Sequence, residues 1–426
     1  MTSDVLDVVN HRRALEALRN GVPNRDAVRV LGCGQQEVEQ RFREQCSVVG
    51  DELLQDRQVP GLLLAGGFGT GKTHLLEYLA HLALAENFVC SRVVISKETP
   101  LYDPAKIYRA AIETAVVPGL NGPAISEIAA SLHMDSPAYA ELREWASRSN
   151  GGVDALFPAT LLLHERLHTD PEWVEQITGF WSGEKLPISL LRQGLRQVGA
   201  SAAFAVKAVS ARQLALQRIR FAARLMRGAG YKGWILLIDE VELIGRYSLE
   251  QRGRSYAELA RWLGKIEDTQ YPGLTAVAAI TDDFELNMLR EKGDREYIGP
   301  KLRNKGTDEF NLLAARAEVG MRMIERESVT LQRPDEMVLH QTYERLKDIH
   351  ARAYDWQPND ISSAERNQTR AMRSYVRRWI NEWDLKRLYP DADVSIMEED
   401  LRPTYGEDQD LEQPAETTEP SDATED

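Results

Sequence analysis

The eight residues Gly66–Thr73, GGFGTGKT, constrain this chain more than any other feature. They fit the pattern G-x-x-x-x-G-K-[ST], which predicts a loop that surrounds phosphate groups with backbone N–H groups. Glycines allow the tight curl and the close approach to a ligand. A following helix directs its free N–H groups and the positive end of its dipole at the anion. We expect Lys72 to reach the β- and γ-phosphates, and the Thr73 hydroxyl to ligate Mg²⁺.

The flanking residues provide the setting that this motif needs. An apolar run at 61–65 predicts a buried parallel strand, a helix follows the motif, and residues 88–97 predict a second strand. Strand, loop, helix and strand in this order form the βαβ unit of an α/β fold. The candidate ATP-binding residues are Gly66, Gly67, Phe68, Gly69, Thr70, Gly71, Lys72, Thr73 and His74, and Lys72 is also a candidate for catalysis.

A second motif, Ile235–Glu240, places acids at the end of another apolar strand. Ligands bind at the carboxyl ends of the strands in parallel sheets. We expect Asp239 to hold Mg²⁺ through water together with Thr73, and Glu240 to polarise the attacking water as the catalytic residue. Glu242 is better explained as a solvated or helix-capping acid.

Thr281 follows a fourth predicted strand within 274–283, and Asp282 stands in reserve behind it. Thr281 either reaches the γ-phosphate or the water, as a catalytic residue, or caps the next helix. Arginines that stabilise a transferred phosphate come from this chain or from a neighbour. The first candidates are Arg370 and Arg373, which share a helix face, and the alternatives are Arg246, Arg252, Arg254 and Arg303.

The rest of the chain is predominantly helical in its pattern. Residues 1–50 predict an N-terminal helical segment, and 51–310 predict the ATPase core with a parallel sheet. Within that core, 98–232 lack a convincing strand and are far too long for an ordinary connection, so we expect a large helical insertion. Residues 311–397 predict a helical lid domain, and 398–426 predict a disordered acidic tail.

Charge is distributed unevenly along the 426 residues, whose net charge is −14. The tail 398–426 holds twelve acids against Arg402, which leaves the remainder close to neutral. Residues 185–238 hold ten bases and no acid, and three arginines, Arg220, Arg224 and Arg227, share one helical face. Such a stripe either contacts double-stranded DNA without reading its sequence or pairs with acidic surface, including the tail.

Other features narrow the class of protein. No apolar run reaches the ~18 residues that span a bilayer, and the first thirty residues do not resemble a signal peptide. We therefore expect a cytoplasmic protein that does not insert into membranes. Cys33, Cys46 and Cys90 lack metal-ligand spacing, and we interpret them as buried or inert thiols.

Four segments of the sequence resemble the BREX phage-defence ATP-binding proteins, in particular the BrxD-like group of the BrxC/BrxD family. The resemblance covers roughly residues 10–390 and is carried by RRALEALRNGVPNRDAV, GGFGTGKTHLLEYLAHLAL, SRVVISKETPLYDPAKIYRA and LLIDEVELIGRYSLEQRGRSYAELARWL. It implies an AAA+-type core related in outline to origin-recognition and helicase-loader ATPases. It also implies that Arg370 is a lid-domain arginine that contacts the nucleotide.

Two main functions are compatible with these observations. The first is a Mg²⁺-dependent ATPase that works as a motor or switch on DNA or on a complex of other defence proteins. The second is a slow, nucleotide-gated scaffold that recruits partner proteins without remodelling DNA. A kinase-like phosphotransferase is a weaker third, because the Asp239–Glu240 pair and the long helical lid argue against it. A homo-oligomer is compatible with either main function.

Overall fold

The computed structural model describes residues 3–21, 24–51, 57–148, 152–361 and 372–390. Five strands within these ranges form one parallel sheet in the order β2-β3-β4-β1-β5. They are β1 (Leu62–Ala65), β2 (Val89–Val94), β3 (Trp234–Asp239), β4 (Leu274–Ile280) and β5 (Val329–Thr330). The predicted α/β class and parallel sheet are therefore confirmed. β5 lies where only helices were expected, and this expectation was wrong.

Successive strand residues point to opposite sides of the sheet, so its apolar strands present apolar side chains on both faces. Helices cover both of these faces. On one side, Leu64, Ile235 and Val277 pack against α3 (Gln36–Gly50) and α4 (Lys72–Ala85). On the other side, Leu63, Leu236 and Ala278 belong to a larger core. This core continues through α5 (Pro104–Glu113), α11 (Ala211–Gly228), α12 (Leu249–Trp262) and α14 (Asp308–Glu327). The result is a three-layer arrangement.

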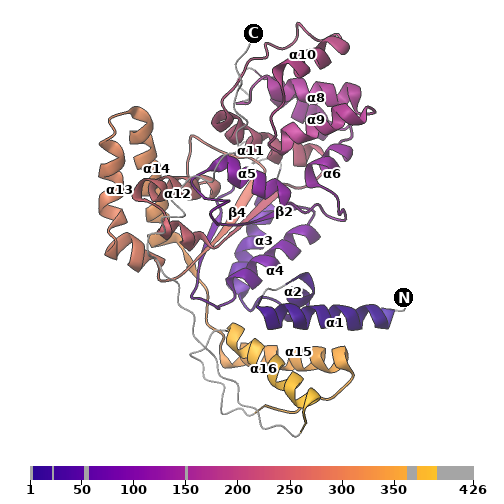
Figure 1. The fold of residues 1–426 in the computed structure, drawn as a ribbon, viewed down its shortest axis with the longest axis vertical. Helices are drawn as coiled ribbons and strands as arrows, with labels where there is room; N and C mark the ends of the chain where they lie inside the picture. Colours follow the sequence, from indigo (N-terminus) through magenta and orange to yellow (C-terminus); the bar gives the residue numbers. More distant parts are fainter. Residues whose placement is uncertain (1–2, 22–23, 52–56, 149–151, 362–371, 391–426) are drawn as a thin grey trace.

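The described residues of the long interval between β2 and β3 form helices joined by loops, with one isolated β-bridge from Val116 to Cys90. Between α5 and α11 it contains α6 (Ala124–Ala130), α7 (Pro137–Ser147), α8 (Leu156–Leu167), α9 (Pro171–Ser182) and α10 (Ile188–Gln197). In its interior, the ring of Phe221 contacts the rings of Phe157 and Trp181. Figure 1 shows most of these helices gathered at one end of the molecule, beyond the sheet.

A second group of helices follows β3. It contains η2 (Val241–Arg246), α12, the π-helix η3 (Glu285–Glu291), α13 (Asp294–Arg303) and α14. α14 approaches α12 closely at Gly320, where a Cβ would lie 2.1 Å from the carbonyl oxygen of Tyr256. α14 and β5 thus continue the body that contains the sheet. The expected start of the lid domain, residue 311, falls inside α14.

The C-terminal helices α15 (Glu336–Tyr354) and α16 (Met372–Leu388) form a separate cluster with α1 (Ser3–Asn20). Its core contains Leu15, Tyr343 and Trp383. The chain returns from α1 to the sheet body through α2 (Arg25–Leu31). In Figure 1 this cluster lies at the opposite end from α8–α10. The expected acidic tail, 398–426, lies outside the described residues.

None of the described helices combines the length and apolar character required to cross a membrane.

Candidate functional site

The loop 66–71 joins the end of β1 to the first residue of α4, as the motif predicts. The Gly66 N–H donates to the carbonyl oxygen of Ile280 on β4 (3.1 Å), which fixes the start of the loop to the sheet. Gly69 and Gly71 adopt positive φ angles of 78° and 102°, a region that favours glycine. A Cβ on Gly66 would lie 2.7 Å from Thr70 Oγ1. The tight curl therefore depends on glycine.

Lys72 folds its side chain back over this loop. Its Nζ donates to the carbonyl oxygens of Gly66 (2.8 Å) and Gly67 (3.4 Å), and it lies 3.8 Å from Glu242 Oε1. The side chain is almost fully buried, so the ammonium group is held within the concave side of the loop. Burial raises the pKa of Glu242 to about 7, although the Lys72 charge opposes this. Glu242 is therefore a buried neighbour of Lys72 and not a solvated acid.

The two sequence motifs meet at Thr73 and Asp239. Thr73 Oγ1 donates to Asp239 Oδ2 at 2.9 Å, although the residues lie 166 positions apart. Asp239 ends β3 and is buried, and its Oδ1 accepts from the N–H of Glu240 at 3.0 Å. A hydroxyl and a carboxylate are the hard oxygen ligands that Mg²⁺ takes alongside phosphate and water. The donor set therefore fits Mg²⁺.

Glu240 stands beside this pair in an unusual backbone conformation. Its φ is 59°, the left-handed region, which turns the chain sharply after β3. Burial and the nearby Asp239 raise the pKa of Glu240, while Lys72, Arg373 and Arg246 act in the opposite direction. A carboxylate with a raised pKa is a stronger base toward water.

The residues after β4 also lie near the loop. Asp282 Oδ2 lies 3.5 Å from the position that a Cβ on Gly67 would occupy. Thr281 is buried and immediately follows Ile280, whose carbonyl accepts from Gly66. The N–H of Phe284 donates to the backbone oxygen of Thr281 at 3.3 Å. Both polar residues therefore stand at the same sheet edge as Asp239.

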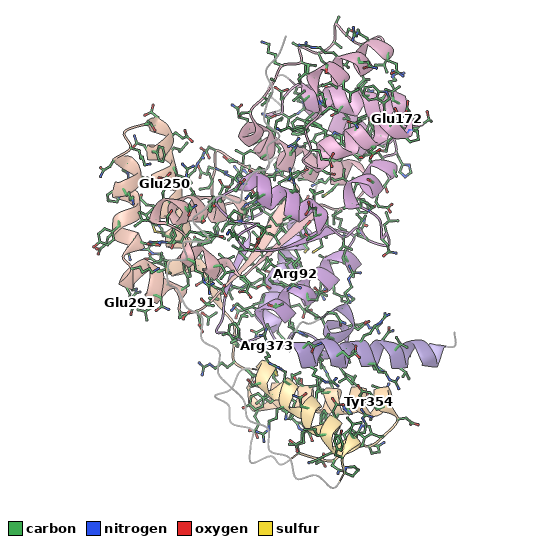
Figure 2. The ribbon with its side chains drawn as sticks, viewed as in Figure 1. Arg92, Glu172, Glu250, Glu291, Tyr354 and Arg373 are labelled. Carbon is green, nitrogen blue, oxygen red and sulfur yellow. The ribbon has the colours of Figure 1, made fainter. Side chains whose placement is uncertain are left out.

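The candidate arginines separate into distinct environments. Arg370 lies outside the described residues. Arg373 lies near the start of α16. Its backbone N–H donates to the carbonyl oxygen of Gly69 (3.3 Å). Its guanidinium lies 5.5 Å from the ring centroid of the half-exposed Phe68. Figure 2 shows Arg373 at the end of α16 that faces the body of the molecule.

Three alternatives are engaged elsewhere. Arg252 forms a buried ion pair with Asp294 (2.8 Å). Arg254 pairs with Glu250 (3.0 Å), and Arg303 pairs with Glu318 (2.5 Å). Arg246 acts on the pKa of Glu240, as Arg373 does. Arg373 and Arg246 are therefore the candidates that the fold brings to the acid pair.

A cavity of about 620 Å³ opens beside the phosphate loop. Residues from several separate segments line it: Gly32–Gln35 before α3, the loop and helix residues Thr70, Gly71, Thr73 and His74, Val329–Leu331 around β5, Val338 on α15 and Arg373 on α16. His74 closes one side, with Nε2 2.7 Å from the carbonyl oxygen of Gly32, and burial lowers its pKa. Sequence reasoning missed the segments 32–35 and 329–331. The glycines of Gly32-Cys33-Gly34 were their one visible signal.

The basic stripe on α11 is partly covered. Arg224 lies over the ring of Trp145, 4.7 Å from its centroid. Arg227 donates to the carbonyl oxygen of Val49 (3.2 Å), and the Arg220 guanidinium lies against Gly152. All three are half-buried. These contacts engage part of the stripe within the chain, and the choice between DNA and acidic surface stays a prediction.

Comparison with known proteins gives one match. The model of the family described as "BREX system ATP-binding protein BrxC/D" matches residues 9–131 and 195–385. The interval left between these ranges contains α7, α8 and α9 of the helical insertion. No curated protein and no solved structure gives a significant match. Because the matched ranges cover well over half of the chain and include both motifs, the protein belongs to the BrxC/D family of BREX system ATP-binding proteins.

Proposed function

We propose that this protein is a Mg²⁺-dependent ATPase of the AAA+ type that serves as a motor or switch in BREX phage defence. The observation that carries the proposal is the hydrogen bond between Thr73 and Asp239. It joins the helix after the phosphate loop to the acid pair at the end of β3. Family membership supports ATP binding, and this geometry supports hydrolysis.

Each residue has a role that follows from its position. The loop amides of Gly66–Gly71 and the Lys72 ammonium bind the phosphates. Thr73 and Asp239 would hold Mg²⁺, which would supply positive charge to the phosphate oxygens. Glu240 orients and deprotonates the attacking water. Thr281 or Asp282 orients the γ-phosphate or that water from the end of β4.

The cavity beside the loop supplies space for the nucleoside. It begins at Thr70–His74, where the phosphates would end, and continues between α3, β5 and α15. Its volume of about 620 Å³ lies in the usual range of small-molecule sites. An ATP bound there would contact the sheet body and the C-terminal helices simultaneously. This supports a division in which α15 and α16 act as the lid.

The lid role depends most on Arg373, which contacts the loop through Gly69 and Phe68. We expect Arg373→Ala to lower the hydrolysis rate at saturating ATP by about tenfold or more, because one cation near the transferred phosphate is lost. Arg377→Ala, on the exposed side of the same helix, is the matched control and should leave the rate near wild type. Steady-state ATPase assays measure both. Equal rates for Arg373→Ala and wild type would exclude this residue from the reaction.

The motor and the scaffold differ in how the ATPase rate responds to DNA. The test is the steady-state rate of ATP hydrolysis by wild type, measured with and without double-stranded DNA. Glu240→Gln, measured in the same way, gives the background rate. A motor or switch acting on DNA should be stimulated several-fold. A slow rate that DNA does not change would contradict that action and favour the nucleotide-gated scaffold. Repeating the assay at two salt concentrations separates electrostatic binding from other effects.

A further inference from the structure

Arg92 on β2 contacts the same carboxylate that is expected to hold the metal. It lies two residues after Cys90, which packs on the α4 side of the sheet, and residues i and i+2 of a strand share one face, so Arg92 also lies on the α4 side. There its Nη2 donates to Asp239 Oδ2 at 3.2 Å. Thr73 Oγ1 donates to the same oxygen. This oxygen of the acid that would hold the metal is therefore engaged by a hydroxyl and a cation.

The guanidinium has a second acid at hand. Its Nη1 donates to Glu77 Oε2 on α4, also at 3.2 Å. Asp239 is almost fully buried, and Arg92 and Glu77 are largely covered. Figure 2 shows Arg92 within the central body, on the side of α4. Glu77, Arg92 and Asp239 thus form a row of acid, base and acid that ends at the metal position.

We propose that Arg92 competes with Mg²⁺ for Asp239 and that Glu77 retains Arg92 when the metal enters. This inference rests on the proposed function, since it concerns the metal that accompanies ATP. Arginine keeps its charge under all ordinary conditions, so the competing cation is permanent. A guanidinium and a divalent cation held at the same carboxylate would repel each other at short range. With Mg²⁺ bound, the guanidinium would leave Asp239 and keep its contact with Glu77.

The row predicts opposite effects for changes at Arg92 and at Glu77. Removing the cation with Arg92→Met frees Asp239, so the metal should bind more tightly. Removing the retaining acid with Glu77→Gln leaves Arg92 with Asp239 alone, so the metal should bind more weakly. Each shift should be about fivefold in the metal dissociation constant, which corresponds to about 1 kcal/mol. A purely structural role would shift both variants in one direction.

The test is a titration of the full-length protein with Mn²⁺ in the presence of saturating ADP. Electron paramagnetic resonance monitors the titration and gives the Mn²⁺ dissociation constant. Tighter Mn²⁺ binding by Arg92→Met together with weaker binding by Glu77→Gln supports the proposal. Weaker binding by both, or no change in either, overturns it. Arg92→Lys keeps the charge but presents a single nitrogen to the two acids, so its Mn²⁺ affinity should fall between those of wild type and Arg92→Met. This variant tests the same direction of change if Arg92→Met does not fold, and weaker binding than wild type would overturn the proposal.

ADP binding in the presence of EDTA separates this inference from the function on which it rests. Arg92 contacts the acids and not the phosphate loop, so both variants should bind metal-free ADP as wild type does. If wild type itself binds no nucleotide, the proposed function fails. If wild type and variants bind nucleotide alike and their Mn²⁺ affinities are equal, only the role of Arg92 fails.

Discussion

Lys72→Ala should lower the affinity for ATP by roughly 30- to 150-fold, because a charge-assisted contact to phosphate contributes about 2–3 kcal/mol. The lysine is buried over the phosphate loop, and its Nζ is held 2.8 Å from the carbonyl oxygen of Gly66. A bound triphosphate would exchange this carbonyl contact for its own oxygens. Isothermal titration of the nucleotide-free protein with MgATP measures the effect.

Lys301→Ala is the matched control for Lys72→Ala, since Lys301 is an exposed residue of α13. It should bind ATP as wild type does. Thermal unfolding of both variants separates loss of the ligand contact from loss of the fold. If Lys72→Ala were folded and retained wild-type affinity, the assignment of the phosphate site to this loop would be wrong.

Glu240→Gln should abolish most hydrolysis while ATP still binds. A positioned general base typically contributes a factor of about 10² to 10⁴ to the rate, and glutamine cannot accept the proton of the attacking water. The amide keeps the size and shape of the carboxylate, so the backbone turn after β3 should persist. Single-turnover hydrolysis of labelled ATP and parallel binding measurements test both halves of this expectation.

Glu242→Gln is the informative control, because Glu242 is a second acid close to Lys72. It should reduce the rate far less than Glu240→Gln. The reverse order would assign the base to Glu242. The pH profile provides a further check: burial raises the pKa of Glu240, and only the ionised form accepts a proton. The rate should therefore fall as pH decreases through this raised pKa, at a higher pH than for an ordinary glutamate.

The sequence predicted those features that depend on local pattern. Four apolar runs became β1–β4, and the GGFGTGKT segment became the loop between β1 and α4. The proximity of Thr73 and Asp239 could also be expected, since the carboxyl ends of parallel strands share one sheet edge. β5 could not be recognised, because Val329–Thr330 is too short to produce an alternating pattern. The same strand extends the sheet body beyond residue 310.

Features that depend on distant contacts were not predictable. The cavity collects Gly32–Gln35, Val329–Leu331 and Val338, and no periodicity relates these segments. The helical pattern of α11 placed three arginines on one face but could not reveal that Trp145 and Val49 cover part of it. In the sequence, Arg92 is a polar residue of a predicted strand, and the pattern does not indicate its partner. Its contact with Asp239 depends on β2 and β3 being neighbours.

The most direct measurement is a crystal structure of the full-length protein with a non-hydrolysable ATP analogue and Mn²⁺, whose anomalous scattering locates the metal. The account predicts one metal between Thr73 and Asp239, phosphates within the loop 66–71, and Lys72 turned from Gly66 to the phosphates. A metal elsewhere, or a nucleotide whose phosphates do not contact this loop, would contradict it.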